Sequence, residues 1–161
     1  MNPSEPLPDA AEPPRILMAE PSGGWAIALR RELGPDWPIE EARSLAECWA
    51  RLARSPGSLA VVQLTQGNVE SLLSRMARWE DEHPRARLAV VADRRWAGHA
   101  WLLREAGAVL FVTSPRRLAP LAALARRHLA AQPEPPISVQ RQIWTNLPWH
   151  KEPRMNTDKH R

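Results

Sequence analysis

The run from Ser58 to Thr65 constrains the fold more than any other stretch, because it is apolar at almost every position and β-branched at its centre. Turn-forming pairs bound it on both sides, Pro56-Gly57 before it and Gly67-Asn68 after it. Consecutive side chains on a strand point to opposite faces of the sheet, so an apolar run needs helices on both faces. The run therefore predicts the central strand of a parallel α/β sheet.

Four further strand-like runs alternate with amphipathic stretches along the chain. We expect these strands at Arg15–Glu20, Pro38–Ala42, Arg87–Asp93 and Ala108–Thr113, and helices at 25–33, 44–52, 68–77, 96–105 and 118–129. Strands and helices that alternate at this spacing imply right-handed crossovers, which place helices on both sides of one sheet. The pattern predicts an α/β domain with a five-stranded parallel sheet.

Three local signals indicate where individual helices begin. Ser44 and Glu47 have the spacing of a capping box, in which the serine accepts a hydrogen bond from a forward N–H and the glutamate reaches back. Asn68 is expected to cap the helix after the central strand. Pro120 fits a helix only in its first turn, where its missing N–H is not needed. The last helix must therefore begin close before Pro120.

Proline, with 17 residues against 7 glycines, divides the chain. Residues 1–14 hold five prolines and little that could pack, so we expect a disordered leader. Residues 15–130 form the expected domain, 131–136 a stiff proline-rich linker, and 137–161 a tail. A chain of 161 residues has room for one such domain and not comfortably for two.

Composition and motifs argue against several classes of function. Cys48 is the single cysteine, which excludes an internal disulfide and suits a reducing compartment. The sequence has neither an apolar run of membrane length nor the start of a signal peptide, so we expect a cytoplasmic protein without membrane contact. It also lacks a phosphate-binding glycine loop, histidines at metal-ligand spacing and a nucleophile–base pair. We therefore expect no catalytic residue, no metal and no cofactor.

The five units and their junctions resemble the receiver domain of bacterial response regulators, from residue 15 to about 130. The most specific part of the resemblance is the pattern Gly107-Ala108, Phe111 and Pro115 around the last strand. The resemblance implies a flavodoxin-like, doubly wound three-layer sandwich with strand order 2-1-3-4-5. It also implies a cis peptide between Ser114 and Pro115, where the family has Lys-Pro.

The residues at the family's working positions lack its chemistry. Receivers carry an acidic pair that binds magnesium, a phosphorylated aspartate, a switch Ser or Thr, and the Lys-Pro pair. Carried over in that order, these positions hold Glu20 and Pro21, Gln63, Ala92, and Ser114 and Pro115. Phosphoryl transfer needs a nucleophilic oxygen, a hard cation held by oxygen ligands and stabilisation of the developing charge, and one carboxylate does not supply these. The resemblance thus implies a pseudo-receiver with a vestigial phosphoacceptor pocket, and not an enzyme.

Two surfaces are candidates for partner binding. In receivers the last helix-strand-helix face is the usual partner-binding face, and here it would carry Trp96, Trp101, Arg104 and Arg116 and could form a homodimer. A merely solvated basic face is the alternative. The second candidate is the peptide 137–150 in the tail, whose large apolar residues are costly to leave in water: Trp144, Leu147 and Trp149. That peptide either folds back onto its own domain or orders on another protein.

These features predict a bacterial signalling module, related to two-component systems, that works by protein–protein binding. Two alternatives remain open. The first is a phosphorylatable regulator with an unorthodox acceptor such as Thr65, although a hydroxyl without a base or metal is a poor nucleophile. The second is a basic nucleic-acid-binding regulator, which the net charge of +4 permits but does not require. No helix-turn-helix or aromatic-basic platform supports nucleic-acid binding.

Overall fold

The computed structural model describes residues 11–133, and these residues fold around one parallel sheet. The strands follow one another in space in the order β2-β1-β3-β4-β5. Their bounds are β1 (Ile16–Ala19), β2 (Ile39–Ala42), β3 (Leu59–Leu64), β4 (Arg87–Ala92) and β5 (Leu110–Val112). The predicted fold class, the parallel pairing and the strand order are all confirmed.

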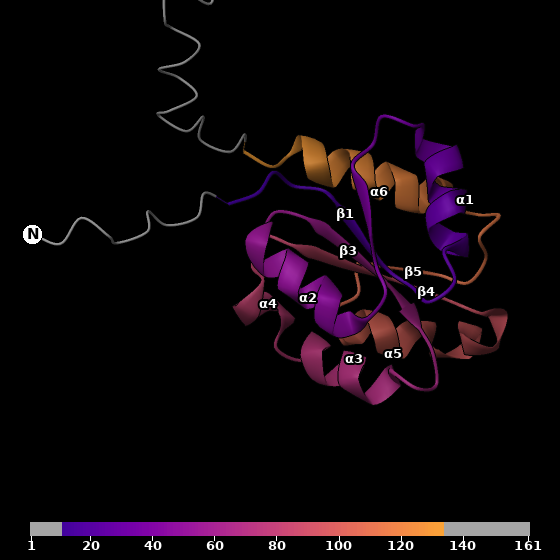
Figure 1. Ribbon diagram of the computed structural model, residues 1–161. Helices are drawn as coiled ribbons and strands as arrows, with labels where there is room; N and C mark the ends of the chain where they lie inside the picture. The colour runs from indigo at the N-terminus through magenta and orange to yellow at the C-terminus, as the bar shows by residue number, and fades with distance from the viewer. Residues whose placement is uncertain (1–10, 134–161) are drawn as a thin grey trace, which may run out of the picture. The chain divides into compact units, whose positions relative to one another are not determined.

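Helices cover both faces of the sheet, as a strand apolar on both sides requires. Figure 1 shows α1 and α6 on one face and the remaining helices on the other. The helices are α1 (Gly24–Leu33), α2 (Leu45–Arg54), α3 (Val69–Met76), α4 (Trp79–Glu82), the 3₁₀ helix η1 (Arg94–His99), α5 (Ala100–Glu105) and α6 (Ala119–Ala130). Within residues 11–133, none of them is long and apolar enough to cross a bilayer.

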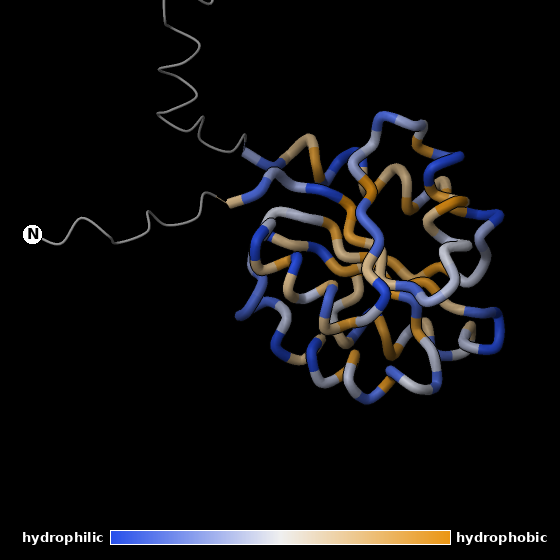
Figure 2. Tube along the Cα trace, viewed as in Figure 1, coloured by the Kyte–Doolittle hydropathy of each residue, from blue (hydrophilic) through white to orange (hydrophobic). Residues whose placement is uncertain are grey.

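The side chains of β3 separate two apolar layers. Leu59 and Val61 pack toward α1 and α6, whereas Ala60, Val62 and Leu64 pack toward the helices on the opposite face. Figure 2 shows the hydrophobic residues concentrated on the central strands. Burying one Val or Leu side chain contributes about 1.5–3 kcal/mol, so this strand is a main source of stability. The central role predicted for the Ser58–Thr65 run is confirmed.

The helix starts follow the predictions in part. Ser44 Oγ accepts a hydrogen bond from the Glu47 N–H at 3.1 Å, as the capping box predicts, but the Glu47 carboxylate accepts from the Arg43 N–H at 2.7 Å. Pro120 lies in the first turn of α6, as expected. The helix predicted at 96–105 begins instead as the 3₁₀ helix η1, which contains Gly98, a weak helix former.

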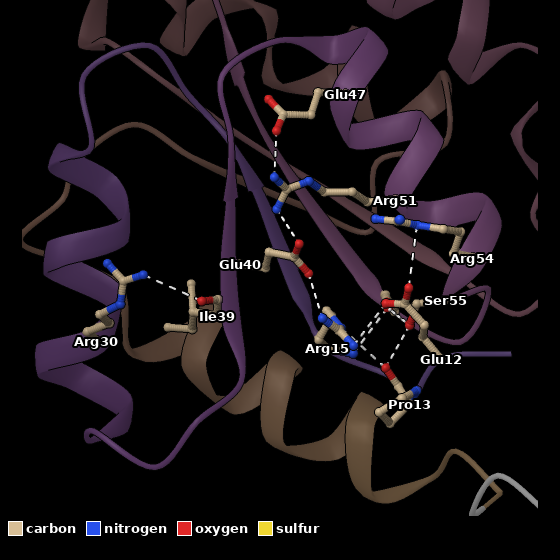
Figure 3. A network of polar contacts seen from close by, with 11 residues as sticks. Glu12, Pro13, Arg15, Arg30, Ile39, Glu40, Glu47, Arg51, Arg54 and Ser55 are labelled. Atoms are coloured by element: carbon tan, nitrogen blue, oxygen red, sulfur yellow. Dashed lines mark hydrogen bonds and ion pairs between the residues drawn. The ribbon is translucent and has the colours of Figure 1, made fainter.

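An ordered extension precedes β1, so the expectation of a disordered leader up to residue 14 is wrong for residues 11–14. The Glu12 N–H donates to the Arg54 carbonyl at 2.8 Å, and Ser55 Oγ donates to the Pro13 carbonyl at 2.7 Å. Figure 3 shows the ion pairs that continue from this extension to the edge strand β2 and to α2. Their members are Glu12, Arg15, Glu40, Arg51, Glu47 and Arg54. These side chains hold the extension where backbone contacts alone are few.

Candidate functional site

The carboxyl edge of the sheet brings together the residues that the sequence predicted for a vestigial phosphoacceptor pocket. In parallel sheets this edge is where ligands bind, because the strand ends and the loops that follow them meet there. Glu20 and Pro21 follow β1, and Ser114 and Pro115 follow β5. Gln63 is the last residue but one of β3, and its register partner is Val91; Ala92 ends β4. The sequence positions are thus gathered as expected, and their chemistry can be judged one by one.

Glu20 is bound within its own chain. Its side chain is buried, with 6% of the residue exposed. Oε2 accepts a hydrogen bond from the Trp25 N–H at 2.9 Å, and Oε1 accepts one from the Ala26 N–H at 2.5 Å. Both donors lie in the first turn of α1, whose N–H groups have no partners inside the helix and attract negative charge. Both carboxylate oxygens of Glu20 therefore serve as the cap of α1.

This use of Glu20 was not predicted from the sequence, although a signal for it exists. Ser22 and Gly23 precede α1, which begins at Gly24, and Gly23 at the N-cap position has no side chain that could cap the helix. Gly23 also has φ of 75°, a left-handed conformation that glycine adopts without strain. A helix that starts on two glycines needs an acceptor from elsewhere, and the acidic residue at the end of the preceding strand supplies it.

The loop after β3 is closed by Asn68. Its Oδ1 accepts a hydrogen bond from the Thr65 N–H at 2.8 Å, and its Nδ2 donates to the Gln63 carbonyl at 2.8 Å. Asn68 stands at the N-cap position of α3, as expected, but its side chain makes no capping hydrogen bond because both ends of the side chain are used by the loop. Gln63 Oε1 is buried and has no hydrogen-bond partner within the described part of the chain.

The remaining positions offer neither a hydroxyl switch nor a cation. Ala92 is fully buried and carries no polar group. The Ser114 carbonyl accepts from the Arg117 N–H at 3.1 Å, which makes Pro115 the second residue of a turn. Proline fits that position with a trans bond, and residues 11–133 contain no cis peptide, so the expected cis Ser114–Pro115 bond is wrong. Ser114 Oγ accepts from the Arg116 N–H at 3.3 Å.

Charge at this edge is predominantly positive. Arg94 and Arg95 follow β4, Arg116 and Arg117 follow β5, and all four are exposed. Asp93, the acidic residue among them, lies 3.6 Å from Arg95. Across residues 11–133, no group of three or more His, Cys, Asp or Glu side chains could hold a metal ion. A divalent cation would meet arginines here and a carboxylate that already accepts two hydrogen bonds.

Two other titratable side chains, those of Cys48 and His128, have structural roles. Burial raises the pKa of the Cys48 thiol to about 12, so this cysteine stays protonated and is a poor nucleophile. His128 on α6 is buried, and its Nε2 lies 2.9 Å from the Gly57 carbonyl. Burial lowers the pKa of His128, and the Gly57 carbonyl offsets part of this effect. His128 therefore joins α6 to the turn before β3.

Solved structures resemble this domain, whereas no protein-family model and no curated protein matches the chain. A response regulator from Thermotoga maritima aligns over 74% of this chain and 100% of its own, with 22% identity and a TM-score of 0.57. A CheY-like protein (tadZ) from Pseudomonas aeruginosa aligns over 76% and 98%, with 20% identity and a TM-score of 0.58. The described domain has the receiver fold.

The receiver fold does not fix an activity by itself. A protein described as an adenylate cyclase from Rhodopirellula baltica aligns over 84% of this chain and 100% of its own, with 13% identity and a TM-score of 0.58. Identities this low establish the fold alone. Function must therefore be argued from the side chains of this chain.

On this receiver fold the last helix-strand-helix face comprises α5, β5 and α6. Trp101 is 72% exposed, and Leu102 and Val109 nearby in sequence are 44% and 47% exposed. Trp96 lies in η1, is half-buried and packs against the core, so it offers less surface to a partner than Trp101 does. Arg104 and Arg116 are exposed. Trp144, Leu147 and Trp149, the other predicted partner residues, lie outside the described residues.

Proposed function

We propose that this protein is a non-catalytic signalling module, a receiver-like domain that has lost its phosphoacceptor site and acts by binding other proteins. The observation that carries the proposal is the side-chain chemistry at two positions, Gln63 and Glu20. Gln63 stands where a receiver has its nucleophilic carboxylate, and the Glu20 carboxylate accepts hydrogen bonds from Trp25 and Ala26. A neutral amide cannot accept a phosphoryl group as a carboxylate does, and magnesium needs carboxylate oxygens that are accessible to it.

The signalling output of such a module depends on which protein partner is bound and not on phosphorylation. The face made by α5, β5 and α6 supports this proposal because it combines exposed Trp101 and Leu102 with Arg104 and Arg116. Tryptophan and arginine are enriched at the centres of protein interfaces, where they supply most of the binding energy. A protein partner or a second copy of the chain would cover this face.

Incubation with acetyl phosphate and Mg²⁺, followed by measurement of the intact mass, tests the loss of phosphorylation. We expect the wild-type chain to gain no phosphoryl group, while a receiver with an intact acidic site is modified in the same mixture. Gln63→Asp should also stay unmodified, because it restores the nucleophile without the metal ligands. A wild-type mass gain that disappears in Thr65→Ala would establish the unorthodox acceptor instead. Phosphorylation of Gln63→Asp would mean that the Glu20 carboxylate is available to a metal after all.

A further inference from the structure

A hollow with three acidic side chains at its rim lies at the opposite edge of the domain, away from the pocket that receivers use. It is formed where the end of α3 and the short helix α4 face the end of α5. Its volume is about 540 Å³, which is within the range of sites that bury a small molecule or a few side chains. Leu73, Met76 and Trp79 contribute its apolar lining, and Glu80, Asp81 and Glu105 its acidic groups.

The three carboxylates have no partners of their own. Glu80, Asp81 and Glu105 are exposed, and none of them takes part in an ion pair or a side-chain hydrogen bond within residues 11–133. The neighbouring Glu82, by contrast, pairs with Arg75 and Arg78. The hollow therefore carries uncompensated negative charge in a domain whose other acidic residues are largely paired.

The apolar side chains form the floor of the hollow beneath this rim. Met76 and Trp79 are almost fully buried, and Leu73 is half-buried. The indole Nε1 of Trp79 has no hydrogen-bond acceptor within the described part of the chain, but this atom is too deeply buried for an occupant of the hollow to reach it. An occupant therefore meets apolar side chains at the floor and unpaired carboxylates at the rim.

A second hollow at the same edge has the opposite charge. It lies against the end of α6, has a volume of about 530 Å³, and is lined by Arg85, Arg87 and Arg127, with His128 beside them. These arginines form no ion pair within residues 11–133. A cationic peptide is repelled there and attracted to the acidic hollow, so charge alone distinguishes the two sites.

The same sequence contains a segment of matching chemistry. Residues 137–161 carry five arginine and lysine residues against two acidic ones, together with Trp144 and Trp149. Both lysines of the protein, Lys151 and Lys159, are in this segment. A tryptophan can pack on the apolar lining while the flanking cations meet the carboxylates, which is how amphipathic cations usually contact such surfaces.

We propose that the acidic hollow lined by Trp79 and rimmed by Glu80, Asp81 and Glu105 binds the cationic, tryptophan-containing segment 137–161 of this protein. The binding uses none of the side chains named for the partner-binding face, Trp101, Leu102, Arg104 and Arg116, so either proposal can fail without the other. Its strength falls with salt, because exposed charges supply much of the attraction.

Zero-length carbodiimide cross-linking of the full chain tests the proposal. The reagent joins a carboxylate to a lysine amine, and the lysines are confined to the proposed occupant. Peptide mass spectrometry should find cross-links from Lys151 or Lys159 to the three carboxylates of the hollow several-fold more often than to Glu32, Asp36 and Glu70. High salt should abolish that preference. Cross-links spread evenly over all six carboxylates, or absent from the hollow, would overturn the proposal.

A matched pair of variants gives a second readout on the same full-length protein. Glu80→Gln, Asp81→Asn and Glu105→Gln together remove the charge of the hollow, and Glu32→Gln, Asp36→Asn and Glu70→Gln remove the same charge elsewhere. All six side chains are exposed, so both triple variants should fold. Trypsin should cut after Arg141 and Lys151 several-fold faster in the hollow variant than in the control. Equal rates in the two variants would refute the docking.

Mixing isotopically labelled and unlabelled chains before cross-linking identifies the source of the segment. Mixed-label products show that the segment comes from a second copy, and their absence shows binding within one chain. A cationic peptide from another protein would be the occupant only if wild-type cross-links from Lys151 and Lys159 never reach the hollow. That result counts against the proposal.

Discussion

At the scale of single residues, the proposed loss of phosphorylation depends on what one carboxylate contacts. The resemblance to receivers matches Glu20 to a metal ligand, yet Trp25 and Ala26 donate hydrogen bonds to it from the start of α1. In a working metal site, carboxylates repel one another when the ion is absent, so removing one charge relieves strain. In this chain the charge stabilises a helix start, and removing it should cost stability.

Replacing this carboxylate distinguishes the two situations. Glu20→Gln keeps the shape but turns one acceptor into a donor that faces an N–H, so we expect a loss of about 1–2 kcal/mol in the free energy of unfolding. Urea denaturation measures it. Glu32→Gln, an exposed position on the same helix, should change stability by less than about 0.5 kcal/mol. A more stable Glu20→Gln protein would show that the carboxylate is strained, as in a metal site.

At the scale of elements, the five strands and most of the helices could be predicted from the sequence because burial imposes a period on each of them, whereas the four-residue helix α4 is too short to show one. The apolar runs predicted β1, β3, β4 and β5, and the weak run at Pro38–Ala42 predicted the short edge strand β2. Side-chain roles in loops could not be predicted in the same way. Asn68 can cap a helix or close a loop, and only the path of the backbone after β3 decides between them.

The candidate site was predictable in its position and not in its contacts. Strand order places Glu20, Gln63, Ala92 and Ser114 at one edge, and the resemblance to receivers supplied that order. The hydrogen bonds of Glu20 involve residues five and six positions later, so they depend on how tightly the chain turns at Gly23. The hollow rimmed by Glu80, Asp81 and Glu105 joins segments far apart in sequence, and no periodicity marks it.

The face made by α5, β5 and α6 can be tested as an element. Trp101→Ala removes its largest exposed side chain and should leave stability nearly unchanged, because 72% of Trp101 is in contact with solvent. We expect the loss of a protein partner, or of self-association in sedimentation, relative to the wild-type chain. Ile27→Ala on α1, a side chain that is 52% exposed, is the matched control. If Trp101→Ala and Ile27→Ala behave alike in affinity capture and sedimentation, this face is not the interface.

At the scale of the whole molecule, buried histidine makes stability depend on pH. Burial lowers the pKa of His128, and also that of His83, below the ordinary value of 6.5. The unfolded chain therefore takes up protons at a higher pH than the folded domain. Stability is complete above about pH 6.5 and falls as the pH drops toward the lowered pKa of the folded state.

Thermal unfolding measured between about pH 7.5 and pH 5 tests this dependence, in a window above most carboxylate titrations. We expect the wild-type melting temperature to fall across this range and the slope to become shallower in His128→Gln. His99→Gln, at an exposed position, should reproduce the wild-type slope. A slope that His128→Gln leaves unchanged would assign the effect to other groups. His83→Gln then shows whether the half-buried His83 carries the effect.

The closed loop after β3 also limits how this scaffold could be re-engineered. One amide side chain, that of Asn68, holds both the carbonyl of Gln63 and the N–H of Thr65. Installing a light- or phosphate-driven response here would require breaking these two hydrogen bonds as well as supplying a phosphoryl acceptor. While these two hydrogen bonds remain, a new acceptor at Gln63 would not by itself free the loop to move.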